Sequence, residues 1–150
     1  MFEHGLMLPS AAEFHHIGYA TKSVEREIET FAKLGYCLEG KPFTDQVQGV
    51  SGCFLVGPGP RIELLESLSD SKTLVPWLEA GIKMYHLAFL VDDIHKSTGW
   101  ARQQRARVTV EPVPAVAFAG RYISFVMFRN GLLVEFIEKA IKEEGSHYVI

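Results

Sequence analysis

The stretch that decides the fold is Phe14-His15-His16-Ile17-Gly18-Tyr19-Ala20, and a matching stretch, Met84-Tyr85-His86-Leu87-Ala88-Phe89-Leu90-Val91, opens the second half of the chain. Each is a short apolar run with a histidine inside it, which is typical of a largely buried β-strand. A second apolar run with an internal glutamate follows in each half, 47 residues after His16 at Glu63 and 49 residues after His86 at Glu135. We therefore interpret the chain as one module that is present twice.

The elements between these markers recur in the same order. The first half is predicted to have strands over 14–20, 36–39, 49–56 and 61–66, a helix from the N-cap Ser23 to Gly35, and a polar loop over 41–48. The second half is predicted to have strands over 84–91, 107–110, 121–128 and 132–138, a helix over 94–105 capped by Asp92-Asp93, and an extended loop over 111–115. A short helix that ends at Gly81 is expected between the halves. This order is βαβββ twice, an α+β fold, with modules at about 14–66 and 84–138 inside a single domain, 1–150.

Length and charge exclude several classes of protein. The 150 residues suit one domain, and the net charge of −3 with no basic stripe argues against a nucleic-acid partner. No apolar run reaches membrane-spanning length, and the N-terminal residues do not form a signal peptide, so we expect a cytoplasmic protein without a membrane partner. Cys37 and Cys53 lack a metal-binding spacing and are interpreted as buried reduced thiols, with a disulfide as the alternative.

The two glutamates carry the chemical information. Glu63 and Glu135 each lie among large apolar residues on a predicted buried strand, where an unpaired carboxylate costs several kcal/mol. His16 and His86 occupy similar positions. Two imidazoles and two carboxylates on four strands suit a divalent metal ion. Taken singly, a strand histidine is more often a core or surface residue, and a strand glutamate is usually solvated, so the recurrence in both halves is what favours a shared metal site.

These residues resemble a known family, the vicinal oxygen chelate superfamily, which includes glyoxalase I, bleomycin-resistance proteins, extradiol dioxygenases and methylmalonyl-CoA epimerase. The chain is most similar to the epimerase type. The resemblance is carried by His16-Ile17-Gly18-Tyr19-Ala20, Gly49-Val50-Ser51, Ile62-Glu63-Leu64-Leu65-Glu66, His86-Leu87-Ala88-Phe89-Leu90-Val91-Asp92-Asp93-Ile94 and Gly131-Leu132-Leu133-Val134-Glu135. It implies a glyoxalase-like fold, in which paired βαβββ modules form a curved, cup-like mixed sheet around one metal ion.

The resemblance also implies a ligand set and a mechanism. The ligands would be His16, Glu63, His86 and Glu135, and the ion would be one of Zn, Ni, Co, Mn or Mg. His15, on the alternate side of its strand, would face away. A metal-polarised carbonyl would make the neighbouring carbon acidic, and Glu135 or Glu63 would act as the catalytic base for an isomerisation, epimerisation or lyase reaction. The expected partner is a small-molecule substrate, with an acyl-CoA or another thioester as a candidate, and the expected assembly is a homodimer.

One departure from the epimerase pattern qualifies this prediction. Epimerases of this type can carry a separate glutamate base on the strand after the Gly-Val pair, but this chain has Ser51-Gly52-Cys53-Phe54 there. Cys53 is a candidate replacement, although a buried structural thiol is the more frequent role for such a residue. The apolar loop 112–122 is a candidate pocket cover. Arg121 at its end is either a partner for a substrate carboxylate or phosphate or, more commonly, a solvated surface residue.

Two other functions fit the same resemblance less well. An extradiol dioxygenase needs open positions for both substrate and oxygen, and a four-ligand set leaves fewer of them. A non-catalytic binding protein of the bleomycin-resistance type would use the same cavity without chemistry, but such proteins generally lack the ligand set. His4, His95 and His147 are predicted to lie at the surface.

Overall fold

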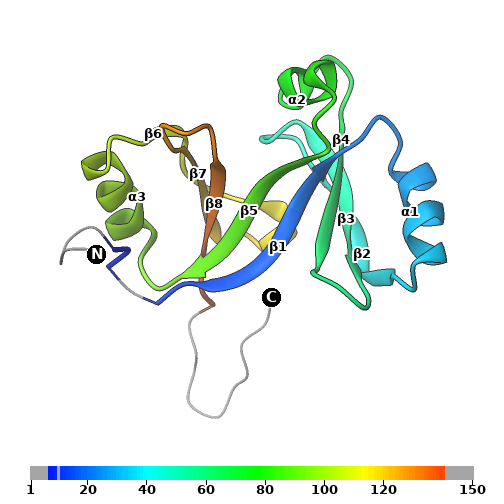
Figure 1. Ribbon diagram of the computed structural model, residues 1–150, viewed down its shortest axis with the longest axis horizontal. Coiled ribbons are helices and arrows are strands. Elements are labelled where there is room, and N and C mark those ends of the chain that lie inside the picture. Colours follow the sequence, from blue (N-terminus) through cyan, green and yellow to red (C-terminus); the bar gives the residue numbers. More distant parts are fainter. Residues whose placement is uncertain (1–6, 10, 141–150) are drawn as a thin grey trace, which may run out of the picture. The chain divides into compact units, whose positions relative to one another are not determined.

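The computed structural model describes residues 7–9 and 11–140, and Figure 1 shows their arrangement. His4, His147 and most of the polar C-terminal tail fall outside these residues. The described part of the chain divides into two compact units, one formed by His15–Leu87 and the other by the described residues up to Phe14 together with those from Ala88 to Ala140. The boundaries cut through two strands, and the single domain expected from the sequence stays a prediction.

The His15–Leu87 unit contains the first βαβββ module. Its elements are β1 (Glu13–Ala20, with its first two residues in the other unit), α1 (Val24–Lys33), β2 (Cys37–Asp45), β3 (Val50–Val56), β4 (Ile62–Ser67) and α2 (Val75–Ala80). The strands lie in the order β2-β3-β4-β1. β1 pairs with β4 in parallel, while β2 with β3 and β3 with β4 pair in antiparallel fashion, so the sheet is mixed.

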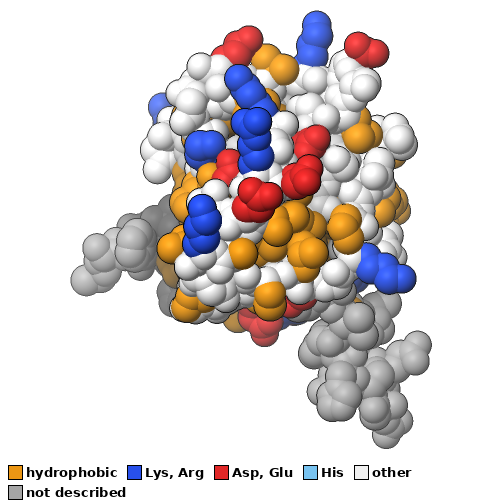
Figure 2. Space-filling view, turned by 90° about the vertical axis from the view of Figure 1, so that its right-hand side faces the viewer, with side chains coloured by type: hydrophobic (Ala, Val, Ile, Leu, Met, Phe, Trp, Pro, Cys, Tyr) orange, Lys and Arg blue, Asp and Glu red, His pale blue; other side chains and the backbone are white. Residues whose placement is uncertain are grey.

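The helix α1 covers one face of these strands, as Figure 1 shows in blue. Phe31 packs with the buried side chains of Tyr19, Leu55 and Leu64, which form the core on this side. Ser23 caps the helix, because its side chain accepts a hydrogen bond from the backbone N–H of Arg26. The predicted cap is therefore confirmed. The outer face mixes acidic and basic side chains in Figure 2, which fits the absence of a basic stripe.

The polar loop predicted over 41–48 is wrong for residues 41–45, because β2 continues to Asp45. Local composition favoured a loop, but pairing with β3 extends the strand across a register shift between Glu39 and Phe43. β2 lies at the edge of the strand order, where Pro42 removes no hydrogen bond from a central ladder. Cys37, predicted to be buried, is exposed on this edge strand, and neither cysteine is in a disulfide.

The other unit contains the second module. Its elements are β5 (Met84–Val91, with its first four residues in the His15–Leu87 unit), α3 (Ile94–Gln103), β6 (Arg107–Pro114), a short 3-10 helix η1 (Val116–Phe118), β7 (Tyr122–Met127) and β8 (Leu133–Glu138). The bounds of β5 match the prediction. Asp93 caps α3 by accepting from the N–H groups of His95 and Lys96, as predicted, and Ile94, Thr98 and Ala101 are buried.

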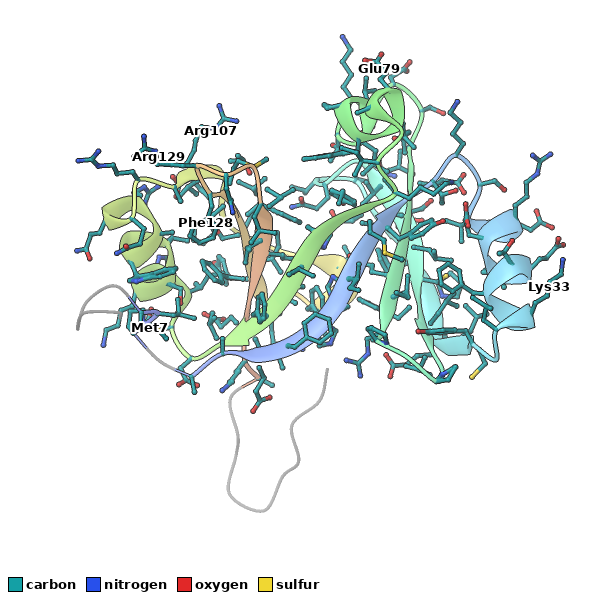
Figure 3. The ribbon with its side chains drawn as sticks, viewed as in Figure 1. Met7, Lys33, Glu79, Arg107, Phe128 and Arg129 are labelled. Carbon is teal, nitrogen blue, oxygen red and sulfur yellow. The ribbon has the colours of Figure 1, made fainter. Side chains whose placement is uncertain are left out.

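The α3 helix and strands β6–β8 enclose the core of this unit, which includes Val91, Val126 and Phe136. Phe128, labelled in Figure 3, packs against this core and meets the Trp100 ring edge-on. The segment 111–115 was predicted to be a loop, but β6 runs on to Pro114 because it pairs with β7 across two register shifts. Proline is tolerated at such irregular positions of a strand.

The apolar segment after β6 folds back into its own unit. Phe118 on η1 is almost fully buried, while Val116 beside it is exposed. Arg121 is half-buried and donates hydrogen bonds to the backbone carbonyls of Phe118 and Glu138. Burial lowers the pKa of its guanidinium below the usual value. The prediction of a solvated surface arginine is therefore wrong, and Arg121 joins the η1 turn to the end of β8.

Candidate metal centre

Three of the four predicted ligands come together in the His15–Leu87 unit. His16 Nε2 on β1 lies 3.2 Å from Glu63 Oε1 on β4 and 3.1 Å from Nε2 of His86 on β5. The distance from His86 Nε2 to the same carboxylate oxygen is 3.8 Å. Residues that are 23 to 70 positions apart in the chain thus bring two imidazole nitrogens and one carboxylate oxygen to a single point.

The strand register explains why these side chains meet. β1 and β4 are parallel neighbours in which Gly18 is opposite Glu63, and His16 lies two residues before Gly18, on the same face of β1. Gly18 makes room for the third group. A Cβ atom at this position would lie 1.9 to 2.4 Å from three atoms of the His86 imidazole, so the ring occupies the space that a side chain would fill.

All three groups are buried, with exposed fractions of 0% for His16, 4% for Glu63 and 3% for His86. A buried carboxylate needs an opposite charge or hydrogen-bond donors close to it. Two imidazole nitrogens at 3.1 Å either share a proton or both bind a cation, since two lone pairs at this distance repel each other. The cluster therefore has the features of a cation site.

The separations between the three atoms fit a small divalent ion. Ligand atoms about 2.1 Å from an ion lie roughly 3.0 Å apart at right angles and roughly 3.4 Å apart at tetrahedral angles. Two of the observed separations, 3.1 and 3.2 Å, fall in this range, and the third, 3.8 Å, lies slightly above it. Nitrogen and carboxylate donors suit Zn, Ni, Co and Mn, and Mg to a lesser degree, so the residues fit the predicted group of ions.

Aromatic side chains pack against the imidazoles of this cluster. The Phe54 ring on β3 lies edge-on to His16, with the ring centroids 5.4 Å apart, and Tyr85 lies edge-on to His86 at 4.5 Å. Such walls hold the imidazoles in one orientation and keep water from their faces, which strengthens electrostatic interactions inside the site.

His15 has a contact that the strand alternation did not predict. Although neighbouring residues of a strand point to opposite faces, His15 Nδ1 lies 2.7 Å from His16 Nδ1. His15 is 2% exposed, so this contact is buried. The only sequence signal for it is the adjacency of two histidines, which by itself does not predict a contact between their rings.

The remaining predicted residues lie elsewhere. Glu135 is on β8 in the other unit, where it is 4% exposed, and its role as a ligand or as a base stays a prediction. His95 is exposed, as expected. Among the described residues no helix is long and apolar enough to cross a membrane, since the longest have 10 residues.

Cys53 is a poor candidate for the missing base. Its side chain is fully buried on β3, and burial, with a smaller contribution from the charge of Glu63, raises its pKa to about 11. The thiol is therefore protonated at neutral pH and cannot accept a proton there. This supports the interpretation of Cys53 as a structural residue.

Comparison with known proteins identifies the family. Residues 15–125 match the model of the Glyoxalase/Bleomycin resistance protein/Dioxygenase superfamily, and the chain belongs to this superfamily. Two of the proteins that it is similar to are named as epimerases. The mitochondrial methylmalonyl-CoA epimerase of Dictyostelium discoideum is 24% identical over 131 residues, which cover 85% of this chain and 78% of that protein.

Two further proteins agree with this assignment. The ethylmalonyl-CoA/methylmalonyl-CoA epimerase of Cereibacter sphaeroides is 25% identical over 125 residues, covering 81% of this chain and 93% of that protein. The crystal structure of methylmalonyl-CoA epimerase from Mycobacterium tuberculosis superimposes with a TM-score of 0.73 at 25% identity, covering 89% of this chain and 92% of the other. The predicted glyoxalase-like α+β fold is thereby confirmed.

We predict that Gly18→Ala removes His86 from the cluster. The new methyl group would overlap the imidazole, and a side chain in the middle of a paired strand cannot move away without moving the backbone. A loss of metal affinity of 10-fold or more, roughly the effect of a displaced ligand partner, is expected in a metal titration. Gly99→Ala is the matched control, because a Cβ atom there meets nothing within 4 Å. Equal affinity in the parent and Gly18→Ala would contradict the argument.

We also predict that the two cysteines differ sharply in reactivity. Cys37 is exposed, whereas Cys53 is fully buried with a raised pKa, so a thiol reagent at pH 8 should label Cys37 quickly and Cys53 only after unfolding. Mass spectrometry of peptides from labelled native and denatured protein measures this directly. Rapid labelling of Cys53 in the native protein would restore it as a candidate base.

Proposed function

We propose that this protein is a divalent-metal-dependent enzyme that transfers a proton at the carbon next to a carbonyl group, and that its substrate is an acyl-CoA thioester. The observation that carries the proposal is the convergence of His16, Glu63 and His86 within 3.8 Å in a buried, aromatic-walled cluster. The proposal is supported by membership of the superfamily and by the similarity to proteins that are methylmalonyl-CoA epimerases.

In this proposal His16, Glu63 and His86 hold the ion, and Glu135 is the fourth ligand. The repeat supports this assignment, since Glu135 follows His86 at nearly the spacing that separates Glu63 from His16. The same strand position also makes Glu135 a buried carboxylate among apolar residues. A bound divalent ion would act as a Lewis acid towards the carbonyl oxygen of the substrate and so acidify the adjacent carbon.

The protein then has to supply a base. β3 carries no carboxylate, and Cys53 is protonated at neutral pH, so the proton must go to a carboxylate of the ligand set, Glu63 or Glu135. His16 and His86 orient Glu63 through their contacts with its Oε1 atom. The aromatic rings of Phe54 and Tyr85 exclude water from the imidazoles, which favours a proton transfer between fixed groups.

A second candidate function follows from the absence of a carboxylate on β3. A strand without the separate carboxylate base suits a binding protein of the bleomycin-resistance type, in which the cavity holds a ligand without transforming it. The metal-type cluster is what favours the enzyme over this alternative. The homodimer and the cytoplasmic location expected from the sequence stay predictions.

The first test is the metal content of the purified protein, measured by elemental analysis. We expect about one divalent ion per chain in the parent, and in His86→Ala, which lacks one of the converging nitrogens, we expect the ion to be lost. His95→Ala is the matched control, because His95 is an exposed histidine on α3 and its loss should leave the metal content unchanged. A parent protein that binds none of Co, Ni, Mn or Zn would rule out the metal-dependent enzyme.

The second test is proton exchange in the substrate. Metal-loaded protein should exchange the α-proton of methylmalonyl-CoA for deuterium in D2O, followed as the loss of the α-proton signal in the NMR spectrum. Whichever of Glu63→Gln and Glu135→Gln removes the base should lower this rate by roughly 10²- to 10⁴-fold. Metal content measured in parallel separates loss of the base from loss of the ion. Metal-loaded protein that binds acyl-CoA but exchanges no proton would favour the binding protein instead.

A further inference from the structure

The ring of His16 has close partners at both of its nitrogen atoms. Its Nε2 atom faces Glu63 and His86, while its Nδ1 atom lies 2.7 Å from Nδ1 of His15. The two adjacent rings are almost perpendicular, with an interplanar angle of 84° and centroids 5.0 Å apart. Both side chains are buried, with exposed fractions of 0% and 2%, so the contact between their nitrogens is shielded from water.

We propose that His15 is a positioning residue for the metal-binding histidine, which it holds in one tautomer and one orientation by accepting a hydrogen bond from His16 Nδ1–H. This inference rests on the proposed function, because it assumes that His16 binds an ion through Nε2. It adds to the ligands a supporting residue, His15, that does not touch the ion.

The tautomers follow from the geometry. A neutral imidazole carries one proton, so a ring that offers its Nε2 lone pair to a cation must carry the proton on Nδ1. His16 Nδ1 is then a donor, and its partner at 2.7 Å, His15 Nδ1, must be the acceptor. His15 in turn carries its own proton on Nε2. Each ring therefore has only one arrangement that is compatible with a bound ion.

The position of His15 is itself fixed. The Phe54 ring lies edge-on to His15 at 5.7 Å and to His16 at 5.4 Å, so it packs against both rings. Arg61 Nη1 donates a 2.9 Å hydrogen bond to the backbone carbonyl of His15. Arg61 is in turn held by Glu39, with Nε 2.8 Å from a carboxylate oxygen. Backbone and side chain at residue 15 are thus both anchored before any ion binds.

The identity of the acceptor has a chemical consequence. Metal-binding histidines commonly donate their second N–H to a carboxylate or to a backbone carbonyl, and a carboxylate raises the basicity of the ligand. An imidazole acceptor is neutral and raises it less. His16 therefore donates less electron density to the ion, which leaves the ion a stronger Lewis acid towards a carbonyl oxygen.

The test compares Co(II) binding by the parent, His15→Phe and His15→Asn. Phenylalanine keeps a flat ring against Phe54 but removes the acceptor, whereas asparagine restores an acceptor atom near the place of Nδ1. We expect His15→Phe to lose 10- to 100-fold in Co(II) affinity, the usual effect of removing such a partner, and His15→Asn to recover most of it. His95→Phe, on the exposed side of α3, should bind Co(II) like the parent.

A second measurement reports the hydrogen bond directly and needs only the parent protein. In the Co(II) form, the ring N–H of a bound histidine gives a strongly shifted proton NMR signal that disappears on exchange with D2O. The two bound histidines, His16 and His86, should each give one such signal, and we expect that of His16 to exchange slowly in the parent and in His15→Asn, because the bond to His15 is buried. In His15→Phe the signal should exchange fast.

The outcomes separate the two proposals. A parent that binds no Co(II) overturns the proposed function and the role of His15 with it. A parent that binds Co(II) but shows no slowly exchanging signal overturns the role of His15 alone, even where His15→Phe fails to fold. Equal affinity and equal exchange in the parent and a folded His15→Phe variant overturn it as well.

Discussion

The buried carboxylate of Glu63 is the constraint on which the rest of the His15–Leu87 unit depends. A carboxylate that is 4% exposed must be paired, and the available partners are the imidazoles of His16 and His86, from strands that are remote in sequence. Their convergence requires the parallel pairing of β1 with β4 and the register that puts Gly18 opposite Glu63. A one-residue slip would turn His16 to the other face of the sheet, so the polar cluster and the strand register specify each other.

The packing around the cluster limits the free-energy cost of burying these polar groups. Gly18 gives its side-chain volume to the His86 ring, and Phe54 closes the space beside His15 and His16. On the opposite side of the strands, α1 covers an ordinary apolar core. The polar cluster therefore lies on one face of β1 and β4, and the apolar core that stabilises the unit lies on the other.

Much of this could be predicted from the sequence, because the signals were periodic. The limits of β5 followed from a continuous apolar run, and His16, Glu63 and His86 followed from the recurrence of histidine and glutamate at similar spacing. The extensions of β2 and β6 could not be predicted, since pairing with a neighbouring strand outweighs proline and polar composition there. The contact between His15 and His16 depends on side-chain rotation, which the alternation of a strand does not encode.

The chemistry open to such a site depends on what the neighbouring strand lacks. Because β3 offers Cys53, whose pKa is raised to about 11, and no carboxylate, the proton acceptor of the proposed enzyme would come from the proposed ligand set itself. A carboxylate that binds a cation is a weaker base than a free one, so a ligand glutamate can take a proton only from a carbon that is already strongly acidified. A neutral imidazole behind His16, rather than a carboxylate, acts in this direction, since it leaves more of the charge of the ion for the carbonyl oxygen. The absence of a carboxylate on β3 and the proposed role of His15 are therefore consistent with each other, since both require a strongly polarised carbonyl group.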